Sequence, residues 1–249
     1  MNYKFFPLLF LVFLFSFTAK ENLINSISKP SEFSTKVVRP MAMGKNEREN
    51  SKEKSELFYC EIQPEGFSLP ELEIFTKAFE GYTVLESQGK IKNNILTIID
   101  FSLSSRKERM WVIDMLNKKV ILQTLVSHGI KSGKEYAKSF SNQNESFKSS
   151  LGFFLTGETY KGKHGISLKL DGLEFGLNDK ARERAVVIHG AEYVSKKLAT
   201  KQGYLGRSQG CPAVEPAIAP KLIQTIKNKS VLYIYHPSRI YVNKSKLVS

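Results

Sequence analysis

Zinc-binding spacings are absent from this sequence. The chain has 2 cysteines and 4 histidines among 249 residues, and none of them falls into an HExxH or CxxC spacing. Such spacings place nitrogen and sulfur ligands close enough to hold one ion. We therefore expect no metal site, and the residues indicate no other cofactor.

Acidic residues are few relative to basic ones. The chain has 37 lysines and arginines against 24 aspartates and glutamates, a formal net charge of +13. Most of the lysines are scattered, as on an ordinary solvated surface, but the excess also suits an anionic membrane or cell-wall surface. The sequence has no helix-turn-helix, zinc-ligand cluster or RNP-like aromatic strand, so we expect no nucleic-acid partner.

The N-terminal apolar run, residues 5–17, is shorter than the 20 or so residues that a membrane span needs. Lys4 precedes it and small residues follow it, a pattern typical of a secretory signal peptide over residues 1–19. An uncleaved anchor is the alternative. Residues 20–60 are polar and lack periodicity, which predicts a linker. The sequence thus favours export to the periplasm or cell envelope.

A helical appendage is predicted over residues 61–90. Ser68-Leu69-Pro70-Glu71 has the form of a capping box, apolar residues follow at helical spacing, and Gly81 is a plausible stop. Cys60, just ahead of it, is expected to be a small buried residue in apolar surroundings. A disulfide between Cys60 and Cys211 is arithmetically possible, but it would consume the nucleophile proposed below.

Residues 91–240 have the pattern of a mainly β domain with flanking helices, and residues 241–249 that of a short basic tail. Turn signals separate the apolar runs, which favours a mostly antiparallel β-sandwich or barrel. The polar segment 131–150 suits an active-site loop. Strands are predicted at 95–100, 110–115, 120–126, 151–156, 166–170, 185–189 and 231–235, and a helix at 215–227.

Cys211 and His189 are the candidate catalytic residues. Cys211 lies in a glycine-containing turn, and His189 ends a short β-branched run. An imidazole can take the proton of a thiol and later return it to a leaving amine, while turn N–H groups hold the oxyanion. We expect the N–H groups of Gly210 and Cys211 to be those donors and the turn to lower the pKa of Cys211. A buried structural cysteine and a core histidine are the alternative.

Several motifs surround these residues in a fixed order between about positions 95 and 236. They are Ser127-His128-Gly129, Phe140-Ser141-Asn142, Ser149-Ser150-Leu151-Gly152, Thr159 to Gly165, Asn178 to Arg182, Ile188-His189-Gly190-Ala191, and Gly206 to Val214. Together they resemble the murein L,D-transpeptidase catalytic-domain family, a YkuD-like group. Better-known members carry Ser-His-Gly-Cys at the nucleophile. Here Gln209 replaces that second histidine, so no role of that histidine transfers to this chain.

The resemblance implies a YkuD-like catalytic domain that acts on peptidoglycan stem peptides. Cys211 would attack the third stem residue, His189 would act as base and then acid, and the Gly190 carbonyl would orient the imidazole. Transfer to a neighbouring amine would give a 3→3 cross-link. The expected substrate-binding residues are Tyr160, His164, His128, Gly190, Arg207, Ser208 and Gln209.

The same residues are also compatible with other functions. Transfer to water would make the protein an L,D-carboxypeptidase. A non-catalytic peptidoglycan-binding module and a general cysteine protease are further alternatives. Arg207 would either meet a substrate carboxylate or brace its loop, and His128 and His164 would either line the groove or hydrogen-bond within turns.

Overall fold

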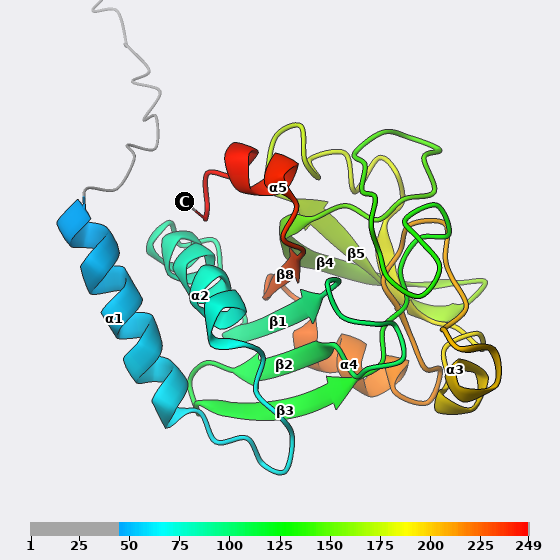
Figure 1. Cartoon of the computed structure of the whole chain (residues 1–249), viewed down its shortest axis with the longest axis horizontal. Helices are drawn as coiled ribbons and strands as arrows, with labels where there is room; N and C mark the ends of the chain where they lie inside the picture. Colours follow the sequence, from blue (N-terminus) through cyan, green and yellow to red (C-terminus); the bar gives the residue numbers. More distant parts are fainter. Residues whose placement is uncertain (1–44, 249) are drawn as a thin grey trace, which may run out of the picture. The chain divides into compact units, whose positions relative to one another are not determined.

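In the described part of the chain, eight strands form one mixed sheet that is the framework of the fold (Figure 1). The computed structural model describes residues 45–248, so the predicted signal peptide and most of the predicted linker lie outside the described residues. The strand order is β3-β2-β1-β8-β4-β5-β6-β7. The strands are β1 Ile95–Asp100, β2 Met110–Asp114, β3 Lys119–Thr124, β4 Gly152–Gly162, β5 Gly165–Gly172, β6 Val187–Gly190, β7 Ala213–Val214 and β8 Val231–Tyr235.

The predicted fold class, mainly β with flanking helices, is confirmed. Each predicted strand coincides with an observed one, and antiparallel pairing dominates. Two pairs are parallel, β1 with β8 and β6 with β7. The two-residue strand β7 had no prediction, because a run so short has no periodicity to detect.

The two edges of the sheet approach each other, which gives a near-barrel. The chain leaving edge strand β3 reaches edge strand β7, where the Ser127 N–H donates to the Ala213 carbonyl at 2.8 Å. Slightly further along the chain, Gly129 forms an isolated β-bridge with Ser208. The closure therefore lies at the turn that carries Cys211.

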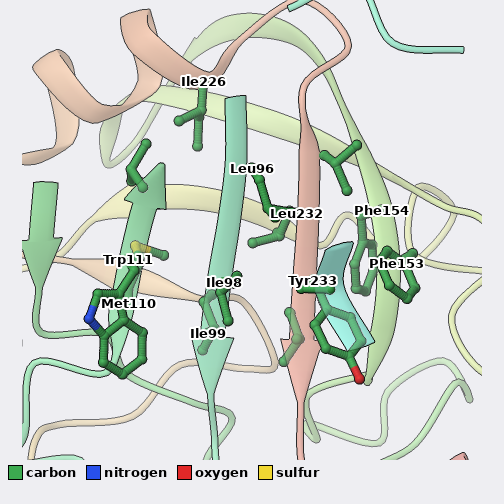
Figure 2. Packing of buried hydrophobic residues seen from close by; sticks show 14 of the residues in the cluster. Leu96, Ile98, Ile99, Met110, Trp111, Phe153, Phe154, Ile226, Leu232 and Tyr233 are labelled. Carbon is green, nitrogen blue, oxygen red and sulfur yellow. The ribbon is translucent and has the colours of Figure 1, made fainter. Parts of the chain in front are cut away.

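The core is centred on β1 and β8. Every residue of both strands is buried, as expected for strands covered on both faces. Figure 2 shows buried residues of this core, among them Leu96 of β1, Leu232 and Tyr233 of β8, and Phe153 of β4. The Phe153 and Tyr233 rings are stacked with centroids 4.3 Å apart.

Within residues 45–248, five helices flank the sheet. They are α1 Lys45–Glu61, α2 Leu72–Ser87, α3 Lys196–Gln202, α4 Ala219–Ile226 and α5 Arg239–Lys244. Helix α2 packs against β1 and β8, whereas α4 packs against β1, β5 and β6 (Figure 1). The predicted helix at 215–227 is thus present but shorter.

Helix α1 contradicts the prediction of a linker as far as residue 60. It packs on α2, where the Phe58 ring lies 5.1 Å from Phe79 and the Tyr59 ring 5.3 Å from Phe75. These tertiary aromatic contacts stabilise the helix, and the polar composition of the segment gave no sign of them. Cys60 is exposed on α1, so the expectation that it is buried is wrong. All the described residues belong to one compact unit, and the helical appendage is part of it.

The predicted start and stop of the second helix are both wrong. Glu71 is its N-cap and makes no side-chain cap bond, while the Ser68 hydroxyl accepts from Gln123 Nε2 at 2.9 Å. The helix also continues through Gly81. A Cβ on Gly81 would lie 2.1 Å from the Phe153 ring, so glycine there allows the helix to approach β4.

The basic tail predicted over 241–249 is packed rather than free. Tyr241 and Val248 are buried, and the Tyr241 hydroxyl donates to Glu174 Oε2 at 3.2 Å. The same oxygen accepts the Phe153 N–H at 2.8 Å. Burial raises the pKa of Glu174. A carboxylate thus ties the C-terminal segment to β4.

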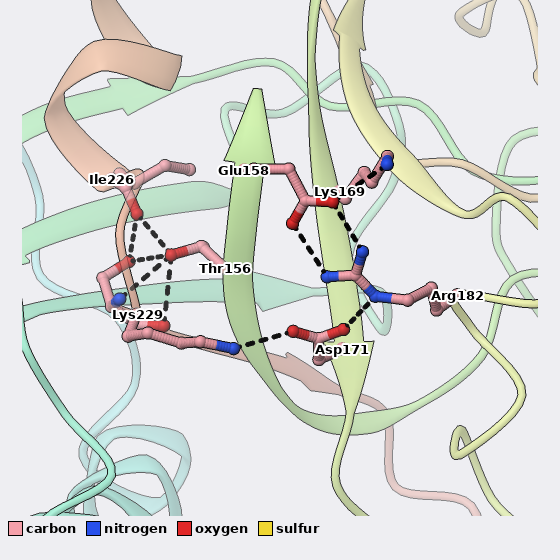
Figure 3. A network of polar contacts seen from close by, with 8 residues as sticks. Thr156, Glu158, Lys169, Asp171, Arg182, Ile226 and Lys229 are labelled. Carbon is pink, nitrogen blue, oxygen red and sulfur yellow. Dashed lines mark hydrogen bonds and ion pairs between the residues drawn. The ribbon is translucent and has the colours of Figure 1, made fainter. Parts of the chain in front are cut away.

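A polar network joins β4 and β5 to the segments around them (Figure 3). Arg182 donates to Glu158 at 2.8 Å and also pairs with Asp171, which in turn accepts from Lys229 at 2.9 Å. Arg182 holds the pKa of both carboxyls below their usual range. These groups are exposed or partly exposed, so we assign them a modest share of stability.

Substitution of Leu232, in β8, tests how much this strand contributes to the core. We expect Leu232→Ala to lower the free energy of unfolding by about 2–5 kcal/mol, because it removes buried methyl groups from the middle of the sheet. Leu116→Ala is the matched control, since this leucine is 72% exposed and should change stability by less than about 0.5 kcal/mol. Urea denaturation measures both, and equal losses would contradict the assignment of β8 to the core.

Candidate active site

One pocket of about 580 Å³ contains both predicted catalytic residues. Five of the seven predicted substrate-binding residues also line it: Tyr160, His164, Arg207, Ser208 and Gln209. The sequence reasoning missed several other lining residues, notably Ile130, Phe147, Lys163, Ala185, Val187 and Tyr193. No aspartate or glutamate is among the lining residues, so the charged groups of the pocket are basic.

Serine hydroxyls hold the turn that carries Cys211. The Ser208 hydroxyl donates to the Cys211 carbonyl at 2.6 Å and accepts the Gly210 N–H at 3.0 Å. The Ser149 hydroxyl donates to the Gly210 carbonyl at 3.1 Å and accepts the Gly129 N–H at 3.0 Å. The segment around Ser149 belongs to the irregular stretch predicted as an active-site loop, and it does border the site.

Gly210 has a φ of +126°, which side-chain-bearing residues rarely adopt. A Cβ there would also lie 2.9 Å from the Lys148 carbonyl oxygen. Both facts explain glycine at this position. Its N–H is already bonded to Ser208, so Gly210 is not free to donate to an oxyanion as expected from the sequence.

The Cys211 thiol is partly buried against the segment before β6. Its Sγ accepts the Val187 N–H at 3.5 Å, and the S–H points to the Ala185 carbonyl at 3.7 Å. Ala185 itself has a φ of +52°, an uncommon conformation for a residue with a side chain. Backbone groups, rather than the imidazole, therefore hold the resting thiol.

His189 is fixed by the backbone of the residue after it. Its Nδ1 lies 2.9 Å from the Gly190 carbonyl oxygen, the contact expected from the sequence. A carbonyl only accepts, so Nδ1 carries the proton and Nε2 keeps its lone pair. The imidazole stacks on His164, with ring centroids 4.7 Å apart and planes at 28°. Gly190 itself is buried and does not line the pocket, so it acts through this carbonyl.

The pKa values indicate a neutral resting pair. Burial lowers the pKa of His189, and the neighbouring His164 and Lys163 lower it further, against the Gly190 hydrogen bond. Burial raises the pKa of Cys211, and this effect exceeds the opposing ones of the Val187 N–H and the Arg184 guanidinium. The expectation that the turn lowers the thiol pKa is therefore wrong for the resting structure.

His128 does not line the pocket. It is fully buried, with Nδ1 2.8 Å from Arg109 Nη2 and Nε2 3.3 Å from the Gly133 carbonyl oxygen. Burial, together with Arg109, lowers its pKa to about 3. The proposed substrate-binding role of His128 is thus wrong, and the residue supports the loop after β3. The sequence could not show this, because the buried Arg109 comes from a different segment, the one that leads into β2.

Arg207 combines the two roles left open for it. It donates to the Gly133 carbonyl at 3.2 Å, its guanidinium lies 5.4 Å from the Tyr204 ring, and it also lines the pocket. It therefore braces the loop while it presents positive charge to the pocket.

Among residues 45–248, no three His, Cys, Asp or Glu side chains lie close enough together to hold a metal ion. The helices described here include none that is both long and apolar enough to cross a membrane.

The neutral state of the pair can be tested by alkylation. We expect iodoacetamide to modify the exposed Cys60 faster than Cys211 at pH 7, because burial raises the pKa of the Cys211 thiol. The rate at Cys211 should rise steeply with pH, with a midpoint above the usual 8.5 or so. Peptide mapping by mass spectrometry measures both sites in one sample. A Cys211 midpoint below about 7 would instead indicate a resting thiolate.

Comparison with known proteins agrees with the geometry. The family model for the L,D-transpeptidase catalytic domain matches residues 69–235. No curated protein sequence matches the chain. Similar solved structures include "L,D-transpeptidase from Mycobacterium smegmatis" (13% identity, 57% of this chain, 59% of that chain, TM-score 0.35). A second is an L,D-transpeptidase from Stackebrandtia nassauensis (14% identity, 75% of this chain, 77% of that chain, TM-score 0.36).

The chain thus spans less than two thirds of the length of the mycobacterial protein. The family match covers more than half of this chain and includes the pocket, the histidine and the cysteine turn. The chain belongs to the L,D-transpeptidase catalytic-domain family.

Proposed function

We propose that this protein is a cysteine-dependent L,D-transpeptidase that acts on peptidoglycan stem peptides. The observation that carries the proposal is the shared pocket of Cys211 and His189, in which the Gly190 carbonyl leaves Nε2 of the imidazole free as a base. Family membership supplies the reaction class. The neutral thiol and neutral imidazole are the protonation states from which the first proton transfer can start.

The first half-reaction makes a thioester. Sγ of Cys211 turns from the Ala185 carbonyl, gives its proton to Nε2 of His189 and attacks the carbonyl carbon of the third stem residue. The Cys211 N–H stabilises the oxyanion, since the Gly210 N–H is committed to Ser208. The imidazolium returns the proton to the amine of the departing D-amino acid, and the C–N bond breaks.

The second half-reaction transfers the acyl group. An amine of a neighbouring stem loses a proton to Nε2 of His189 and attacks the thioester carbonyl. The C–S bond breaks, and the imidazolium returns the proton to the Cys211 thiolate. The product is a 3→3 cross-link. Water in place of the amine would yield an L,D-carboxypeptidase product through the same steps.

The charge of the pocket suits a peptide with free carboxylates. Lys163 and Arg207 line it, and no acidic side chain does. Stem peptides carry carboxylates at the departing D-amino acid, and such groups pair well with a guanidinium or an ammonium. We assign Lys163 and Arg207 to these carboxylates, with Tyr160, His164 and Gln209 along the peptide.

Two substitutions test the chemistry. Cys211→Ala should abolish turnover of purified muropeptides, because it removes the attacking sulfur. His189→Gln should lower the acylation rate by about 10²–10⁴, the range for loss of a general base. Cys60→Ala is the control and should keep full activity, since Cys60 is exposed on α1. Release of D-alanine, followed by mass spectrometry, measures all three. Wild-type activity in a folded Cys211→Ala variant would refute the mechanism.

The same assay separates the alternatives. With an added acceptor stem, a transpeptidase gives cross-linked dimers, whereas a carboxypeptidase gives only tripeptide stems. Binding without turnover would indicate a peptidoglycan-binding module.

We also propose that the protein is exported to the periplasm or cell envelope. The support is the basic, short apolar and small-residue pattern of residues 1–19. Intact-mass analysis of the protein from the envelope fraction should show a chain trimmed near residues 18–20. A full-length cytosolic chain would contradict both export and access to peptidoglycan.

A further inference from the structure

Arg184 lies beside the nucleophile turn and is not used by the mechanism above. Its Nη2 donates to the Lys148 carbonyl at 2.7 Å and to the Ser146 hydroxyl at 3.2 Å. Its Nη1 donates to the Ser141 carbonyl at 2.7 Å and also to the Ser150 hydroxyl. Its Nε is buried and has no hydrogen-bond partner among the described residues. Every acceptor is neutral, and no carboxylate of the described residues pairs with this guanidinium.

The guanidinium is directly adjacent to the turn. A Cβ placed on Gly210 would lie 3.6 Å from Arg184 Nη2. The next residue along the chain, Ala185, supplies the carbonyl to which the Cys211 thiol points. Cys211 and Arg184 also interact electrostatically, the charge of each favouring that of the other. The position of Arg184 and its electrostatic interaction with Cys211 therefore both indicate that this cation acts on the nucleophile turn.

Arg184 is half-buried. A half-buried cation without an anion is destabilised, because neutral acceptors replace only part of the hydration that it loses. In the resting state Cys211 is neutral, so the charge of Arg184 is uncompensated. Once the thiol proton has moved to His189, the sulfur is negative and the cation acquires a partner. An interaction that strengthens as charge develops lowers the barrier to that step.

We propose that Arg184 is a positioning residue for catalysis, whose charge stabilises the thiolate of Cys211 as the thiol proton leaves for His189. The proposal rests on the function proposed above for its role in turnover, but the effect on the thiol does not require a substrate. The hydrogen bonds from Arg184 to Lys148 and Ser141 hold the guanidinium in place for this purpose.

Other ionisable groups line the same pocket as Cys211. They are Tyr160, Lys163, His164, His189, Tyr193 and Arg207. Burial, and then Cys211, raise the pKa of Tyr193 to about 12, so it is neutral near pH 7. Lys163 is exposed and Arg207 donates to the Gly133 carbonyl, whereas Arg184 lies beside Gly210 and is the cation that lowers the pKa of Cys211.

The test measures ionisation of Cys211 directly. Full-length wild-type protein and the variants R184Q and R184K are alkylated with iodoacetamide between about pH 6 and 10, and peptide mapping follows Cys211 with Cys60 as the internal reference. In R184Q we expect the midpoint for Cys211 to rise by about one pH unit or more, so that its rate near pH 7 falls about tenfold. R184K keeps the charge and should retain most of the wild-type rate.

R182Q is the matched control. Arg182 is two positions away and pairs with Glu158 and Asp171, so its loss should leave the Cys211 midpoint unchanged. Circular dichroism confirms that each variant is folded. If R184Q does not fold, R184M replaces it, because methionine keeps an apolar stem without the charge.

Two results would overturn the proposal. One is an unchanged midpoint in the folded neutral variant. The other is an equal rise of the Cys211 midpoint in R184K and R184Q. The hydrogen bonds of the guanidinium, and not its charge, would then be responsible. A midpoint that shifts as expected in a protein without muropeptide turnover would support the role of Arg184 while refuting the proposed function. Turnover that depends on Cys211, with no shift of the Cys211 midpoint in R184Q, would support the proposed function while refuting the role of Arg184.

Discussion

Closure of the sheet at the nucleophile turn is the constraint on which the site depends. The chain after β3 reaches β7 through the Ser127–Ala213 hydrogen bond, so opposite edges of one eight-stranded sheet meet there. This is possible because the C-terminal strand β8 inserts between β1 and β4 and joins the two halves of the sheet. Gly210 then packs so closely on Lys148 that a side chain would not fit. The position of Cys211 is thus set by contacts between segments far apart in the chain.

In the resting site, backbone groups hold the two reactive side chains in place. Backbone groups of Ala185 and Val187 hold the thiol, and a backbone carbonyl holds the imidazole in the tautomer that leaves Nε2 free. Among the described residues, no carboxylate hydrogen-bonds to His189. Burial raises the pKa of the thiol and lowers that of the imidazole, so both groups rest neutral. Negative charge therefore appears on sulfur during the reaction rather than before it, and the protein must stabilise it at that moment.

Positive charge without negative counterparts is the other feature of this region. Arg207 donates to the Gly133 carbonyl, and Arg184 is held by neutral acceptors beside the turn. The lining of the pocket contains basic side chains and no acidic ones. Neutral backbone and hydroxyl acceptors fix these cations in direction without neutralising them. The arrangement favours anionic groups in the pocket, whether they come from the substrate or from the nucleophile.

The sequence by itself determined strands β1 to β6 and β8, helices α2 and α4, and the assignment of Cys211 and His189 to one site. Apolar runs and turn residues are local signals, and the chemistry of a thiol beside a histidine is specific. Only the tertiary structure decided the rest. It made residues 45–61 a helix through aromatic contacts with α2, and it buried His128 against Arg109. It also tied the Gly210 N–H to Ser208 and placed Arg184 at the turn. Burial and hydrogen-bond partners depend on segments distant in the chain, and a local sequence pattern does not identify which distant residue makes the contact.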